Sequence, residues 1–403
     1  MKFLLLAISL GVWVSAAPAQ AEVRFSDFQH EEILGYISAV QFKNSTLSHN
    51  LLYGSTKLDA RLSDWTFSAA LRFSGELGVA PNKSPNGEVE IRSLNLGYAQ
   101  GDYKLTFGFQ EIPWGETFGF YIADLVNPKD LRDPILNELG WIRVPVFALN
   151  AQYFLDKTTF QFILTPVPRN PRVPLRGSNF DIFPEGIPSQ DLRSFDLSRM
   201  DEEAEWGGRV SQLFSSGLDL GLMYFQHWNR TPVYELISGS QIAPAQVRVN
   251  TLALTASQAL NQWVIRMDSI ATLGQPIPDI NLGAPRRVLD WQTIVGTDYS
   301  PSDSWTFGAQ YHKEWANPEF WHWGSFRVAY KWAEGRWATE MFVFAGLNNS
   351  DGWLQRKLIW NVSRRLVVSL SLDVLGYSIS KRPGILTSFL NADRVLGWVT
   401  YHF

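Results

Sequence analysis

Segments in which apolar side chains alternate with polar or small ones recur along most of the chain. The pattern is clear over residues 65–74, 103–110 and 305–312, where every second side chain is apolar. A period of two residues is typical of a β-strand with one apolar face and one polar face. The segments run for about 9–13 residues, nearer to the ~9–11 of a tilted transmembrane strand than to the ~5–6 of a soluble sheet.

Short polar turns join these segments in pairs, and longer connections separate the pairs. Short turns on one side and long loops on the other are typical of bacterial outer-membrane barrels. With a further strand near 33–42, the pairs predict an all-β fold, a closed transmembrane antiparallel β-barrel of roughly 16–18 strands. The short turns are expected at Ser63-Asp64, Gly101-Asp102, Asp156-Lys157, Ser215-Ser216-Gly217, Asn261-Gln262, Pro301-Ser302-Asp303, Glu334-Gly335-Arg336 and Ser363-Arg364.

Aromatic residues stand at the ends of many of these segments. Amphipathic rings at the level of the lipid headgroups form two girdles around membrane barrels. The residues expected in these girdles are Trp65, Tyr103, Trp263, Trp305, Trp337 and Trp353.

The N-terminus has the pattern of a secretory signal peptide. Met1-Lys2 is followed by an almost unbroken apolar run over 3–14, and Ala19-Gln20-Ala21 forms a small-residue cleavage site. A basic start, a short apolar stretch and an A-x-A site together describe such a peptide. We therefore expect residues 1–21 to be removed on export, which leaves 22–403 as a single barrel domain.

The last segment supports the same interpretation. Residues 395–403 alternate between the two faces, and the chain ends on Phe403. This ending resembles the signal by which outer-membrane barrels are handed to the barrel-assembly machinery. Together with the signal peptide it predicts an integral protein of the bacterial outer membrane, with its outer wall against lipid and Phe403 contacting the assembly machinery.

Composition narrows the classes of function. The 403 residues include 17 Trp, 26 Phe and 13 Tyr, no Cys, and a net charge of −4. Without Cys there is no disulfide framework, thiolate zinc site or cysteine nucleophile. Without a basic excess, nucleic acid is not an expected partner. Common nucleotide-binding and hydrolase motifs are missing, so we expect no cofactor, no metal and no catalytic residue.

Two inserts, 112–145 and 166–203, are far longer than the other connections. The first is rich in apolar side chains such as Trp114 and Phe118, which need a surface to pack against. Residues 128–139 predict a short helix with Asn127 as its N-cap. We expect both inserts to fold into the lumen and the first to narrow it; packing over the mouth is the alternative.

The stretch from Gly108 to Pro145, which includes the first insert, resembles a known family. The motifs are Gly108-Phe109-Gln110, Trp114-Gly115-Glu116, Asn127-Pro128-Lys129-Asp130 and Arg143-Val144-Pro145. They resemble the G-x-Q, W-G-E and N-P-x-D signature, followed by a basic residue and Pro, of a large family of uncharacterised bacterial outer-membrane β-barrel proteins. The resemblance covers 94–154 and implies a porin-like barrel linked with transport of hydrophobic compounds.

Charged residues of this insert suit a pore constriction. A charged loop folded inside a barrel sets a transverse field and a size limit, although caps and salt bridges that only fold the loop explain each residue equally well. The candidates are Trp114, Glu116, Asp124, Asn127, Asp130, Arg132 and Arg143. The polar phase of the strands adds the expected lumen-lining residues Arg72, Lys104, Gln110, Arg209, Arg266, Asp268, Asp290, Gln310, His312, Lys331 and Glu340.

The lumen therefore carries both signs of charge together with aromatic surface. This mixture favours a channel or transporter for passive movement of a small hydrophobic or amphiphilic solute. One alternative is a hydrolytic enzyme built into the barrel, for which His312, Glu314 and Asp290 would be the acid/base candidates. Another is a structural barrel that docks an envelope partner.

Overall fold

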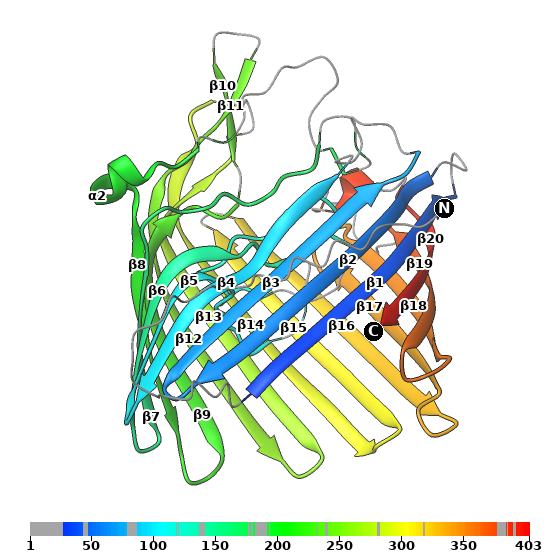
Figure 1. Cartoon of the computed structure of the whole chain (residues 1–403). Coiled ribbons are helices and arrows are strands. Elements are labelled where there is room, and N and C mark those ends of the chain that lie inside the picture. Colours follow the sequence, from blue (N-terminus) through cyan, green and yellow to red (C-terminus); the bar gives the residue numbers. More distant parts are fainter. Residues whose placement is uncertain are drawn as a thin grey trace.

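The alternating segments form one closed antiparallel barrel in the computed structural model of the chain (Figure 1). Eighteen strands are joined edge to edge in a single sheet. The sheet closes because β1 (Asp27–Gln41) pairs with both β2 (Leu47–Leu62) and β20 (Arg394–His402). Closure leaves no open strand edge, as a sheet within a membrane requires.

The remaining barrel strands follow in chain order, and each pairs with the preceding and the following barrel strand. They are β3 (Trp65–Glu76), β4 (Glu88–Gln100), β5 (Tyr103–Gln110), β6 (Val146–Leu155), β7 (Thr158–Thr165), β8 (Glu205–Leu213), β9 (Leu218–Trp228), β12 (Arg248–Leu260), β13 (Trp263–Ile277), β14 (Arg286–Ser302), β15 (Trp305–Ala316), β16 (Glu319–Trp332), β17 (Trp337–Gly346), β18 (Gly352–Asn361) and β19 (Leu366–Leu375).

The structure describes residues 27–42, 47–78, 87–117, 119, 121–136, 142–175, 178, 180–181, 192, 194–231, 233–237, 241–279, 283–316, 319–376, 384, 386–389 and 392–403. The expected signal peptide and Phe118 lie outside these residues. Within them, no helix is both long enough and apolar enough to cross a membrane.

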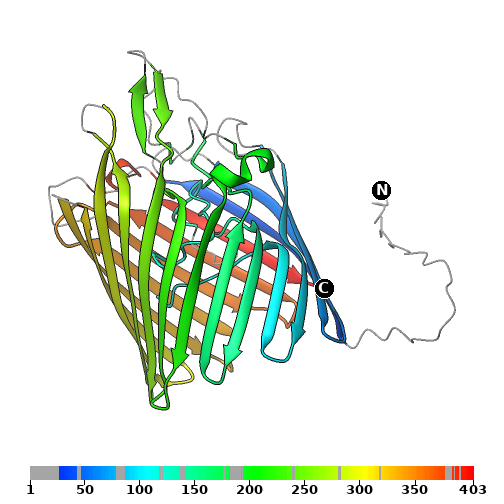
Figure 2. The same cartoon turned by 90° about the vertical axis from the view of Figure 1, so that its left-hand side faces the viewer.

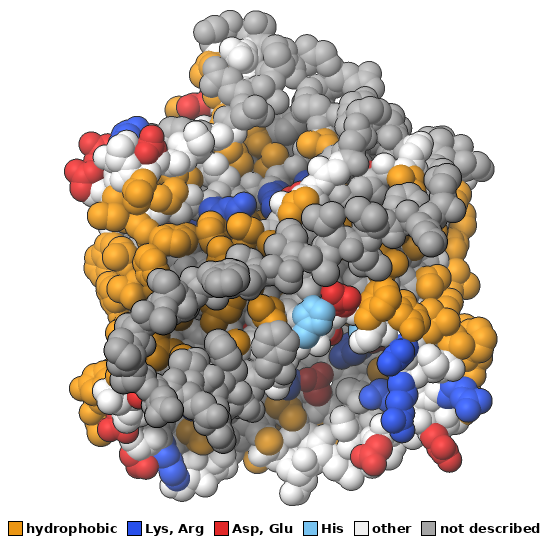
Figure 3. All heavy atoms as spheres, viewed as in Figure 1, with side chains coloured by type: hydrophobic (Ala, Val, Ile, Leu, Met, Phe, Trp, Pro, Cys, Tyr) orange, Lys and Arg blue, Asp and Glu red, His pale blue; other side chains and the backbone are white. Residues whose placement is uncertain are grey.

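The period of two places apolar side chains on the outer wall. On β5, Leu105 and Phe107 are 45% and 53% exposed, whereas Gln110, in the opposite phase, is 6% exposed. Figure 3 shows hydrophobic side chains over the left and right sides of the wall, with charged side chains at the lower rim and at the upper left. An apolar band between polar rims is the surface that a lipid bilayer covers.

Stacked aromatic pairs mark the end of the barrel that carries the short turns. Trp263 stacks on Tyr299 and Trp305 on Tyr330, with ring centroids 4.3 Å apart in both pairs. Trp353, expected in a girdle, instead faces inward and is 9% exposed. The prediction was wrong because Leu354, which is exposed, occupies the outward phase of β18.

The predicted short turns lie together at one end of the barrel, and the long connections lie at the other (Figure 2). One turn differs from the prediction: β14 includes Pro301 and ends at Ser302, so the turn to β15 is 303–304. The register shifts between Tyr299 and Ser302, and such an irregularity tolerates a proline, which has no N–H to donate.

The long connections hold the remaining regular elements. The β10 (Tyr234–Ile237) and β11 (Gln241–Pro244) hairpin stands above the barrel, as both views show (Figures 1 and 2). The 3-10 helix η1 (Leu197–Arg199) and helix α2 (Met200–Glu203) precede β8, and the 3-10 helix η2 (Leu386–Phe389) precedes β20.

Candidate functional site

The connection between β5 and β6, residues 111–145, turns inward from the wall. Asn127 ties the two ends of this insert together. Its Oδ1 accepts the N–H of Ile112 at 2.7 Å, and its Nδ2 donates to the carbonyl of Val144 at 2.9 Å. Asn127 is 1% exposed, and its buried amide satisfies backbone groups that would otherwise lose their hydrogen bonds on leaving water. Asn127 is therefore a clasp within the insert and not a helix cap.

The helix predicted over 128–139 is wrong for residues 128–136, the part that the structure describes. These residues pair with other segments: the N–H of Asp130 donates to the carbonyl of Ile142 at 2.7 Å, and that of Leu131 to the carbonyl of Arg172 at 2.8 Å. Tertiary pairing supplies the backbone hydrogen bonds that a helix would have made, so it overrides local helical propensity.

One end of the insert is anchored to the wall at β13. Asp268 accepts the N–H of Glu116 at 3.1 Å, the N–H of Thr117 at 3.0 Å and the Thr117 hydroxyl at 2.6 Å. Asp268 is fully buried, and three donors compensate the cost of burying its carboxylate.

The other end of the insert is anchored to β2 and β20. Asp133 lies 2.5 Å from Nη1 of Arg394 and 2.7 Å from Nε2 of His49. Burial alone would raise the pKa of Asp133, but Arg394 and His49 outweigh it and hold this pKa well below its usual range. The anchor thus stays charged at neutral and mildly acidic pH.

The two anchors lie on nearly opposite walls. Asp268 on β13 and Arg394 on β20 are seven strands apart around the 18-stranded sheet. The insert therefore crosses the lumen, as the sequence predicted. Two residues before Glu116, the indole N–H of Trp114 donates to Gln161 of β7 at 2.9 Å, and its ring meets Phe225 edge-on at 5.6 Å.

The predicted carboxylates of the insert are paired with arginines. Asp124 and Arg143 meet at 2.5 Å, Asp130 and Arg132 at 2.6 Å. Glu116 is held more loosely, 3.5 Å from Arg209 of β8. Pairing offsets the desolvation of charges inside a protein.

A larger network joins the insert to β3, β4 and residue Arg172 of the second insert. Arg172 lies 2.9 Å from both Glu88 and Glu90. Local sequence patterns do not reveal this network, because its members come from four separate segments of the chain. The members are Arg72, Glu88, Glu90, Arg92, Glu111, Asp130, Arg132 and Arg172.

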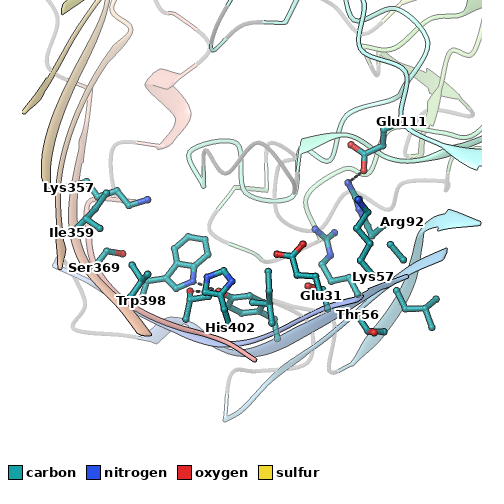
Figure 4. Close-up of a pocket in the computed structure, with 18 residues that line it drawn as sticks. Glu31, Thr56, Lys57, Arg92, Glu111, Lys357, Ile359, Ser369, Trp398 and His402 are labelled. Atoms are coloured by element: carbon teal, nitrogen blue, oxygen red, sulfur yellow. Dashed lines mark hydrogen bonds and ion pairs between the residues drawn. The ribbon is translucent and has the colours of Figure 1, made fainter. Parts of the chain in front are cut away.

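The crossing insert leaves a hollow at each end of the lumen. The first, which we call the inner chamber, has a volume of about 520 Å³ and lies at the short-turn end. Figure 4 shows Lys357, Trp398 and His402 on one side of it and the Arg92–Glu111 ion pair on the other. The ammonium of Lys357 lies 5.5 Å from the ring centroid of Trp398.

The second hollow, which we call the outer chamber, has a volume of about 400 Å³ and lies at the long-loop end. Its wall is aromatic, formed by Trp323, Phe342, Phe344 and Trp353 from β16 to β18. His312 stacks on Trp323 with ring centroids 4.8 Å apart. Insert residues, among them Tyr121, Lys129 and Ile135, form the opposite side.

The other expected lumen residues are distributed around the wall. Arg266 pairs with Asp298, and Glu340 with Arg327 at 2.9 Å. Gln310 and His312 line the outer chamber, and the Gln110 amide donates to the carbonyl of Ala148 at 2.9 Å. Lys104 and Lys331 are exposed near the short-turn end, in the inward phase of β5 and β16.

Several residues of the site escaped the sequence analysis. His49, Arg92, Arg172 and Arg394 hold the insert, yet none of them belongs to a motif. Arg394 opens the terminal strand in its inward phase, and that phase was the available signal. No group of three or more metal-ligating side chains occurs among the described residues.

Comparison with known proteins identifies the architecture. The outer membrane protein opdK from Pseudomonas aeruginosa superimposes with a TM-score of 0.56 at 10% identity, covering 94% of this chain and 100% of that one. OccAB4 from Acinetobacter baumannii gives 0.57 at 9% identity, covering 93% and 97%. The fold is that of an outer-membrane porin. No protein-family model and no curated protein matches the sequence.

This fold agrees with the exposed apolar wall and the closed sheet, and it places the chain in a bacterial outer membrane. At about 10% sequence identity the comparison shows the fold alone. The class of solute is therefore inferred from the residues that line the lumen.

Proposed function

We propose that this protein is a passive channel for a small, partly apolar solute, and that it is not an enzyme. The observation that carries the proposal is the insert that crosses the lumen and leaves a chamber on each side. A packed constriction between two hollows limits solute size, while the polar wall keeps the route hydrated.

The composition of the chambers supports an amphiphilic solute over a simple salt. In the network beside the insert, arginines and carboxylates pair with one another, which leaves little net field to select one ion charge. The outer chamber presents four aromatic side chains, and ligand sites are mostly apolar with a few polar groups that fix orientation. Transport of hydrophobic compounds, implied by the sequence motifs, agrees with this wall.

Reconstitution tests the proposal directly. The refolded barrel is expected to give stable single-channel steps in planar bilayers, and to admit small amphiphiles into liposomes faster than sugars of the same size. A correctly folded barrel that neither conducts nor admits any solute would contradict it. Recognition of Phe403 by the assembly machinery remains a prediction for a separate assay.

A further inference from the structure

We infer that the outer chamber binds an organic cation, an ammonium group on an apolar body, with Glu314 as its counter-ion. The inference rests on the proposed channel function and names the class of solute that the channel would take. The carboxylates around this chamber differ in whether they already accept hydrogen bonds from the protein.

Four carboxylates line the outer chamber, and three of them already have donors. Asp130 accepts from Arg132, and Asp133 from Arg394 and His49. Asp351 accepts the indole N–H of Trp323 at 2.8 Å and the N–H of Leu386 at 2.6 Å. A carboxylate with such donors has little capacity left for a ligand.

Glu314 is the fourth, and no described residue gives it a hydrogen bond or an ion pair. It lies on β15 beside His312, in the phase that faces the chamber. A carboxylate that is partly withdrawn from water gains most from a cation that enters the same space.

Asp290 strengthens the negative field behind Glu314. Glu314 is opposite Gln292 on β14, and Asp290 is two residues along the same face. Asp290 is 4% exposed; Gln292 donates to its Oδ2 at 2.8 Å, while its Oδ1 has no hydrogen-bond partner among the described residues. Two under-satisfied carboxylates on adjacent strands favour a ligand that brings donors and positive charge.

The aromatic wall suits the rest of such a ligand. Trp323, Phe342, Phe344 and Trp353 offer apolar surface for its body, and aromatic faces attract a cation electrostatically. Lys129 also lines the chamber, but Asp124 of the insert lies in its electrostatic neighbourhood.

The charged residues of the inner chamber differ from those of the outer chamber. The lining of the inner chamber includes Lys57, Arg72, Arg92 and Lys357. Lys57 pairs with Asp59 at 2.7 Å, Arg72 and Arg92 with Glu90, and Lys357 lies over Trp398. Its cations are thus engaged by the protein, and its carboxylate without a partner among the described residues, Glu31, is exposed to solvent, whereas Glu314 in the outer chamber is half-buried.

The test uses matched probes on the full-length barrel in planar bilayers. 2-Phenylethylammonium, 3-phenylpropionate and 2-phenylethanol share an aromatic body and differ in charge. We expect the ammonium to interrupt the current at concentrations about tenfold or more below those of the other two, as a charge-assisted hydrogen bond would give. This comparison in the wild-type protein needs no variant.

Substitutions then locate the site. E314Q is isosteric and is expected to weaken block by the ammonium about tenfold or more. E340Q changes the charge of the lumen by the same amount but does not line the chamber, so it should weaken block far less. Stronger block by the acid, equal block by the alcohol, or equal loss in both variants would overturn the inference. A barrel without any conductance would instead refute the channel.

Discussion

Lys129 is the only Lys or Arg among the described residues that line the outer chamber. Burial lowers the pKa of Lys129 to about 8, and Asp124 only partly opposes this shift. The ammonium form is therefore lost as the pH rises through about 8, and the chamber becomes more negative. A permanently charged probe such as phenyltrimethylammonium should then block the current at lower concentrations.

The control for this prediction is K129M, in which the side chain at position 129 carries no charge at any pH. We expect the pH dependence of block to be smaller in this variant than in the wild-type protein, because one of the groups that titrate at the chamber is gone. A flat profile in the wild-type protein, or the same rise in K129M, would show that Lys129 does not set the field of the chamber.

A substitution of the single residue His312 tests the alternative that the barrel is a hydrolytic enzyme. The ring of His312 stacks on Trp323, 25° from parallel, which is the packing of a wall residue. We expect the purified barrel to hydrolyse ester and peptide substrates no faster than H312A does. Hydrolysis by the wild-type protein that H312A loses, with assembly unchanged, would move the assignment to an enzyme.

At the scale of elements, the anchor between the insert and the wall is the feature to perturb. Asp133 and Arg394 are 10% and 1% exposed as side chains. Removing one partner of such a pair leaves a buried charge and costs about 3–5 kcal/mol. D133N should therefore lower the temperature at which the barrel loses its heat-modifiable mobility on gels, and should make the open-channel current noisier.

D59N is the matched control, because Asp59 pairs with a Lys57 side chain that is 51% exposed. Exposed pairs contribute about 0–1 kcal/mol, so this variant should unfold near the wild-type temperature. Equal destabilisation by D133N and D59N would mean that Asp133 does not hold the insert.

The strands themselves could be predicted because their pattern is local. The alternation of Leu105 and Phe107 with polar neighbours states both the element and the face that meets lipid. The path of the insert could not be predicted, because Asp133 meets residues 84 and 261 positions away. The prediction of a helix over 128–136 was wrong for the same reason, because the backbone of this segment hydrogen-bonds to the carbonyls of Ile142 and Arg172.

At the scale of the whole molecule, closure of the barrel followed from the count of paired segments and from the strand that ends the chain. Whether the lumen is open did not follow, since that depends on how one insert bridges β13 and β20. The inward phase of the strands did identify Asp268 and Asp290, but not which carboxylate would be left for a ligand. That distinction needs the three-dimensional partners.

The proposed channel function depends on the crossing insert, which we propose sets the constriction of the channel. Deleting residues 117–139 removes the crossing between the Asp268 and Arg394 anchors while leaving every barrel strand intact. Single-channel conductance of this variant, refolded and compared with the wild-type protein in the same salt, is the most direct measurement. We expect conductance to rise severalfold; an unchanged conductance in a correctly folded variant would contradict the account.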